Sequence, residues 1–125
     1  MIRIDYRDGG FKAERLNKQG AYRLKTLMTV TDDVGELNIE IRRGFIFNIS
    51  RPGILAKLLI RDDDPKLLPA ACVHDYLIVS REWPRLLALG PFLHIYAMQK
   101  PSPIKFRIIS LALLFRSYVI DRKMK

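Results

Sequence analysis

The chain has 125 residues, of which 49% are hydrophobic and 28% are charged, and its formal net charge is +9. This length suits one buried core, and the composition is typical of a globular protein rather than a disordered one. We therefore expect a single domain over residues 1–125. The single cysteine, Cys72, excludes an internal disulfide and a cysteine-based zinc site, and its apolar surroundings predict a buried thiol.

The positive charge lies at the two ends of the chain. Residues 1–25 hold seven basic and three acidic side chains, residues 26–99 hold eight and nine, and residues 100–125 hold seven and one. Basic ends favour an acidic protein surface or a polyanion such as DNA as the partner. The sequence contains no zinc-finger or helix-turn-helix signature, so a solvated surface that faces a partner is the preferred interpretation.

The first half of the chain predicts β structure. Residues 2–6 alternate between apolar and polar side chains, and residues 11–16 are expected to return as their partner strand after a glycine turn. A second hairpin is expected between residues 22–30 and 37–47, because an acidic, glycine-containing turn separates them. The sequence leaves open whether residues 1–20 form the first hairpin or an arm that orders on a partner.

After Pro52 the pattern predicts helices. Residues 54–60 form a short apolar segment, and the three aspartates that precede Pro65 are expected to cap the next helix, over residues 67–79. Another short helix is expected to end before Gly90-Pro91, since proline lacks the backbone N–H that a helix interior needs.

The expected fold class is therefore α+β, with N-terminal antiparallel strands or hairpins packed against a C-terminal helical layer. Residues 1–50 are expected to be mainly strands and residues 52–121 mainly helices. The last apolar stretch, residues 104–120, is interrupted by basic side chains, so we expect a helix that packs on protein and no membrane span.

A histidine and an aspartate, His74 and Asp75, stand in the middle of an apolar helical segment. Burial of such groups without partners is costly, so they need a hydrogen-bond network, a metal ion or a chemical role. The other histidine, His94, is expected at the edge of the core. The sequence has no nucleophile elbow, glycine-rich phosphate loop or His-Glu-x-x-His motif.

Four short motifs precede a basic, apolar C-terminal helix. In chain order they are Tyr22-Arg23-Leu24, Gly44-Phe45-Ile46-Phe47-Asn48, Ala70-Ala71-Cys72-Val73-His74-Asp75-Tyr76-Leu77 and Ala97-Met98. Their order and spacing, over residues 22–118, resembles the small phage and prophage proteins of the DUF1353 family. The resemblance implies a site that combines an aspartate, a His-Asp pair and a further aspartate, as a metal-binding or hydrolytic site does.

The chain departs from this family pattern at the site itself. Asn48 stands where the first aspartate is expected, and the last aspartate falls at Pro91 or, in another alignment, at Pro84. Neither proline side chain can bind a metal ion or act as a base. The loss of two acidic groups favours a structural hydrogen-bond network over catalysis. Its expected members are Asn48, Ser50, His74, Asp75 and Tyr76.

Three functions follow as hypotheses. The first is a bacteriophage structural protein of the tail or head-to-tail region, made in the host cytoplasm and localised in the virion, with other virion proteins as partners and no cofactor. The second is a metal-assisted peptidoglycan hydrolase in which His74 and Asp75 bind Zn²⁺ or transfer protons. The third is a DNA-binding accessory protein. The residues expected to contact partners are Arg107, Arg116, Arg122, Lys123 and Lys125.

Overall fold

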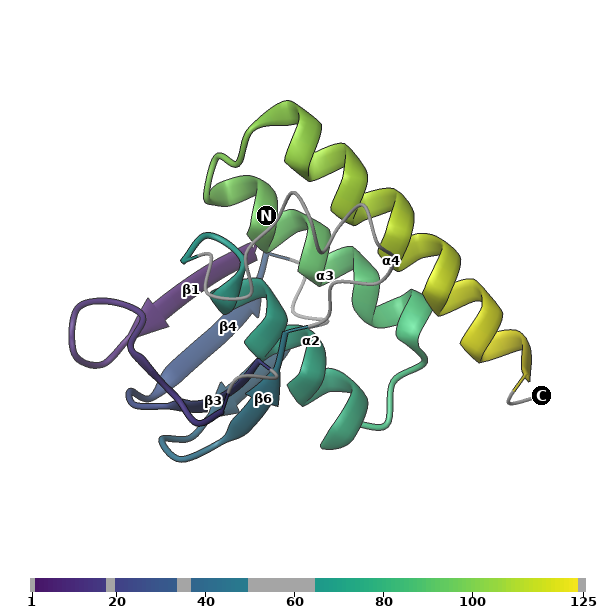
Figure 1. Ribbon diagram of the computed structural model, residues 1–125. Helices are drawn as coiled ribbons and strands as arrows, with labels where there is room; N and C mark the ends of the chain where they lie inside the picture. Colours follow the sequence, from purple (N-terminus) through teal and green to yellow (C-terminus); the bar gives the residue numbers. More distant parts are fainter. Residues whose placement is uncertain (1, 18–19, 34–36, 50–64, 124–125) are drawn as a thin grey trace. The chain divides into compact units, whose positions relative to one another are not determined.

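Among the residues that the computed structural model describes, the strands come first along the chain and the helices follow (Figure 1). The structure describes residues 2–17, 20–33, 37–49 and 65–123. The strands belong to one compact unit, Met1–Asn48, and the helices of the described residues to a second, Ile49–Lys125. The α+β class is thus confirmed, whereas the union of both units in a single domain stays a prediction.

The strands of the described residues form two antiparallel sheets of three strands each. One sheet has the order β1-β4-β5 and the other the order β2-β3-β6. In chain order the strands are β1 (Ile2–Tyr6), β2 (Ala13–Arg15), β3 (Ala21–Leu24), β4 (Met28–Asp32), β5 (Asn38–Ile41) and β6 (Ile46–Asn48).

The strands come in three consecutive pairs along the chain: β1 and β2, β3 and β4, and β5 and β6. Each pair gives one strand to each sheet, so the two sheets together form a three-stranded meander that is bent in the middle. Backbone hydrogen bonds continue through the bend: the Lys25 N–H donates to the Lys12 carbonyl (2.8 Å) and the Gly44 N–H to the Leu24 carbonyl (2.8 Å). Gly44 has a φ of +100°, a conformation that favours glycine.

The expected hairpin between residues 2–6 and 11–16 is wrong. β1 pairs with β4, and β2 pairs with β3. The turn residues between β1 and β2 carry the chain from one sheet into the other rather than reversing it, because both strands find partners in the next stretch of chain. The second expected hairpin is confirmed, since β4 pairs with β5 and β3 with β6.

The buried side chains of the first sheet lie in rows across its strands. Ile4, Val30 and Ile39 are opposite one another, and Tyr6, Met28 and Ile41 form the next row. Val30, Met28 and Ile41 have no exposed surface, whereas the alternate residues of β5 are exposed. The predicted alternation of buried and solvated side chains in β5 is therefore confirmed.

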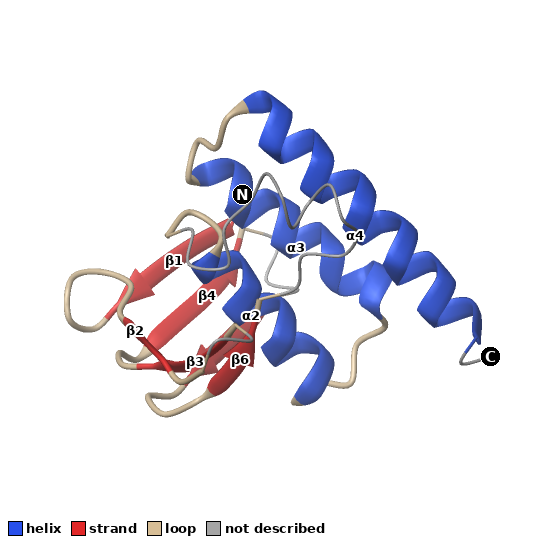
Figure 2. Cartoon of the chain, in the orientation of Figure 1, coloured by secondary structure: helices blue, strands red, loops and turns tan. Residues whose placement is uncertain are grey.

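Three helices follow in the described part of the second unit, and α3 lies between the other two (Figure 2). Five side chains of α3 are buried: Ala88, Leu89, Phe92, Ile95 and Tyr96. The helices are α2 (Leu68–Val79), α3 (Arg85–Met98) and α4 (Pro103–Lys123).

The helix starts and ends differ from the sequence expectations in two places. The N-cap of α2 is Leu67 rather than an aspartate, while the expected segment 54–60 and Asp62, Asp63 and Asp64 lie outside the described residues. The expected break at Gly90-Pro91 is wrong, because α3 continues through Pro91. Gly90 has no Cβ to clash with the proline ring, and buried residues on both sides of Pro91 hold the helix together.

The last helix begins at a clear sequence signal. The Ser102 Oγ accepts a hydrogen bond from the Lys105 N–H (3.3 Å), and Pro103 occupies the first helical position. The expected C-terminal helix is confirmed, and it runs three residues beyond residue 120.

Candidate functional site

His74 lies on α2, where only 7% of its surface is exposed. Its ring meets the Phe92 ring of α3 edge to face, with centroids 5.5 Å apart and an interplanar angle of 73°. The ring centroids of Phe92 and Tyr96 are 6.0 Å apart. The Tyr96 ring stacks on the Phe106 ring of α4, with centroids 5.8 Å apart. A row of aromatic rings thus links the three helices, and His74 stands at its α2 end.

The surroundings of His74 oppose a positive charge on its ring. Burial lowers the pKa of the imidazole to about 4, and the charges of Arg85 and Arg116 lower it further in the same direction. His74 is therefore neutral at pH 7. Within the described residues its Nε2 atom is buried and has no hydrogen-bond partner, a situation that costs about 1–3 kcal/mol.

His74 and Asp75 do not form a pair in space. Consecutive residues of an α-helix point about 100° apart, so their side chains cannot face one another. Asp75 is half-buried and Tyr76 is also half-buried on the same helix. Among the residues that the structure describes, no three His, Cys, Asp or Glu side chains lie close enough to hold one metal ion.

Cys72 is fully buried on α2, as expected. Burial raises the pKa of its thiol far above the usual range, and the charge of Asp75 raises it further. The thiol is thus protonated at neutral pH and is a packing residue rather than a nucleophile.

The other expected members of the polar network lie elsewhere in the chain. Asn48 ends β6 in the strand unit, and Ser50 lies outside the described residues. The hydrogen bonds that we expect between them and His74 or Asp75 stay a prediction. His94 is exposed on α3, so the expectation that it lies at the edge of the core is wrong.

The most exposed apolar surface of the helical unit lies on α4. Ile104, Leu111, Phe115 and Tyr118, which we call the outer stripe, are separated by seven, four and three positions and therefore lie along one side of the helix. Between 51% and 72% of each of these residues is exposed. Leu114 flanks the stripe and is 48% exposed.

The opposite side of α4 is the side that packs in the unit. Ile109 and Leu113 are buried there, at 0% and 3% exposure, and Phe106 stacks on Tyr96. The sequence predicts that this helix contacts partners, which stays a prediction, and it does not show which apolar residues face outward. Both sides of the helix are apolar, so the usual contrast between an apolar and a polar side is absent.

The expected partner-binding residues are partly located by the structure. Arg107 and Arg116 are exposed on α4. Arg122 and Lys123 belong to its last turn, and Lys125 lies outside the described residues. Over its whole length, α4 contains five basic residues and one acidic residue.

Within the described residues, no helix is long and apolar enough to cross a membrane. Comparison with known proteins gives no match, either to a protein-family model, to a curated protein or to a solved structure. The likeness to the DUF1353 family therefore stays a hypothesis that depends on the four motifs and on their order.

Proposed function

We propose that the protein is a structural component of a bacteriophage particle, located in the tail or head-to-tail region, and that it attaches to another virion protein through α4. The observation that carries this proposal is the outer stripe. Four large apolar side chains along one side of a helix are costly to leave in water, and surfaces of this kind are typical of protein interfaces.

The charge of α4 favours one kind of partner. Five basic residues against one acidic residue suit an apolar groove with an acidic rim, where the apolar contact provides affinity and the charges orient the helix. A second copy of this chain is a poorer partner, because its α4 would carry the same positive charge.

The region around His74 supports a structural role rather than a catalytic one. The imidazole is buried against Phe92, and Asp75 points to a different side of α2. A hydrolase would need a water molecule and a substrate at these groups. The position of the His74 ring against Phe92 is better suited to holding α2 against α3.

The proposal is tested on phage particles purified by density gradient. We expect mass spectrometry to find the chain in these particles, and we expect the double substitution Leu111→Asp and Phe115→Asp to reduce its incorporation at least tenfold. The matched control is Val79→Asp, because Val79 is an apolar side chain on α2 that is 66% exposed outside the outer stripe.

Three results would contradict the proposal. The first is the absence of the wild-type chain from purified particles, and the second is normal incorporation of the chain after the double substitution. The third is a stoichiometric Zn²⁺ ion in the purified protein that is lost on His74→Ala, which would support the peptidoglycan hydrolase instead.

A further inference from the structure

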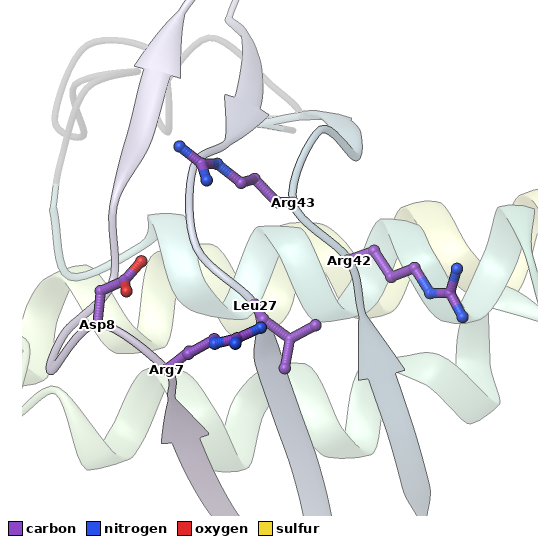
Figure 3. A pocket seen from close by; sticks show the side chains of 5 residues that line it. All are labelled: Arg7, Asp8, Leu27, Arg42 and Arg43. Carbon is purple, nitrogen blue, oxygen red and sulfur yellow. The ribbon is translucent and has the colours of Figure 1, made fainter.

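A cavity of about 420 Å³ lies in the strand unit, far in sequence from α4. Its lining consists of three arginines, one aspartate and one leucine: Arg7, Asp8, Leu27, Arg42 and Arg43 (Figure 3). We call it the arginine cavity. None of these residues belongs to the motifs or the site candidates of the sequence analysis.

The sheet order explains why residues so distant in sequence meet here. Arg7 follows β1, Leu27 precedes β4 and Arg42 follows β5, and these three strands are neighbours in one sheet with β4 in the centre. Arg7 and Arg42 therefore lie at the same end of the sheet, one on either side of Leu27. The backbone N–H of Arg7 also donates a hydrogen bond to the Leu27 carbonyl (3.1 Å). This bond fixes the backbone of Arg7 beside the residue that precedes β4.

Arg42 and Arg43 are held by a tight turn. The Phe45 N–H donates a hydrogen bond to the Arg42 carbonyl (3.2 Å), and Gly44 supplies the positive φ that this turn needs. Arg42 and Arg43 are consecutive, and Figure 3 shows their side chains pointing in different directions from the turn. The cavity therefore presents guanidinium groups at separate positions rather than around one point.

The charges at the cavity are not balanced by its own residues. Its lining contains three guanidinium groups and one carboxylate, that of Asp8. Glu40 lies 3.8 Å from Arg42, but both side chains are more than half exposed, and such surface pairs contribute little. Three positive side chains gathered by the fold, with room between them for a ligand, are the features of an anion-binding site.

We propose that the arginine cavity binds phosphate groups of a nucleic-acid backbone. Guanidinium groups form paired hydrogen bonds with phosphate oxygens, and their separate positions suit successive phosphates along a strand better than a single phosphate ion. Contacts to phosphates carry no sequence information, so binding is independent of base sequence. Its lining residues belong to the strand unit, and none of them lies on α4.

The experiment measures the binding of a fluorescent 20-base-pair DNA of scrambled sequence to the full chain by polarisation, over a range of salt concentrations. In the triple variant Arg7→Gln, Arg42→Gln, Arg43→Gln, we expect the affinity to fall at least tenfold. The slope of log affinity against log salt concentration should also decrease by about 2 to 3, because each lost phosphate contact removes about 0.9 from it.

The control variant removes the same total charge from other exposed positions: Arg3→Gln, Lys12→Gln and Arg81→Gln. We expect it to change the affinity less than threefold, because these side chains lie outside the cavity. All substituted arginines are exposed, and circular dichroism should show equal folding of both variants and the wild type. A charge-conserving variant with lysine at positions 7, 42 and 43 should bind with intermediate affinity, because lysine lacks the paired donors.

Three outcomes would overturn the proposal. Wild-type protein that does not bind the DNA is the first, and an equal loss of affinity in both triple variants is the second, because binding would then depend on total charge alone. The third is displacement of the DNA by inorganic phosphate at an equal concentration of phosphate groups, which would identify the free ion as the ligand.

Discussion

His74 and the outer stripe of α4 are two exceptions to the usual distribution of polar and apolar side chains, and they are exceptions of opposite kinds. His74 is a polar residue in the helical interior, whereas the stripe consists of apolar residues on the surface. The buried histidine is easy to notice in the sequence, but its position between α2 and α3 makes it a packing residue. The exposed stripe is hidden in an apolar segment, yet it is the better candidate for function.

The difference shows that the chemistry of a residue type says little until its accessibility is known. An imidazole can bind a metal ion or transfer a proton only if another molecule reaches it. A leucine or phenylalanine needs only to be exposed beside others of its kind to become a binding surface. Three predictions, from the largest effect to the smallest, test whether the two regions differ in this way.

The largest effect is expected for α4, where a buried and an exposed residue lie two positions apart. Ile109→Ala should lower the free energy of unfolding by about 4 kcal/mol, because it leaves a cavity in the core of the helical unit. Leu111→Ala should change it by less than about 0.5 kcal/mol, because Leu111 is 68% exposed. Urea denaturation of both variants measures the difference.

Equal losses of stability in the two variants would contradict the assignment of the outer stripe as a free surface. In that case Leu111 would be a core residue, and the outer stripe would not be a surface that a partner could bind. Ala112 directly follows Leu111 on the same helix and shows that α4 already accommodates alanine.

The second effect is the response of stability to acid. His74 has a pKa of about 4 in the folded protein and about 6.5 in the unfolded chain. Between these values the unfolded chain binds a proton that the folded protein does not bind, so stability falls as the pH decreases from about 6.5 to 4. The loss contributed by His74 should reach about 3 kcal/mol near pH 4 and be absent above pH 7.

Denaturation curves between pH 4 and pH 7 measure this loss, and two variants separate its sources. His74→Leu should remove the part of the pH dependence that arises from the imidazole. His94→Ala should leave that part in place, because it keeps the buried imidazole of His74. A pH dependence that is unchanged in His74→Leu would show that the imidazole does not titrate in this range.

Much of the fold follows from local sequence patterns, and the exceptions have physical causes. The alternation of Ile39 and Ile41 with polar residues predicts a half-buried strand correctly, and Ser102-Pro103 marks the start of α4. The pairing of β1 with β4 is not a local property, because turn residues alone do not show whether a chain reverses or bends into a second sheet. The continuation of α3 through Pro91 likewise depends on tertiary packing that offsets the lost hydrogen bond.

The candidate sites are less predictable than the fold. The sequence places His74 and Asp75 next to one another on one helix. Consecutive side chains of a helix point in different directions, so the two cannot act as a pair whatever the family resemblance implies. The arginine cavity gives no local signal at all, because Arg7 and Arg42 are brought together only by the strand order. A correct sheet topology would have been required to find it.

The smallest effect is expected from replacing the histidine at neutral pH. His74→Leu removes a buried Nε2 atom that has no hydrogen-bond partner among the described residues, and it keeps an apolar side chain of comparable size against Phe92. The lost ring contact opposes this gain, because an edge-to-face aromatic pair contributes about 0.5–1.5 kcal/mol. Since the cost of an unpaired buried polar atom is about 1–3 kcal/mol, we expect a net stabilisation of about 1 kcal/mol at pH 7. A loss of 2 kcal/mol or more, measured by urea denaturation, would mean that the imidazole makes a stabilising polar contact, and the histidine would then belong to the network that its sequence position first suggests.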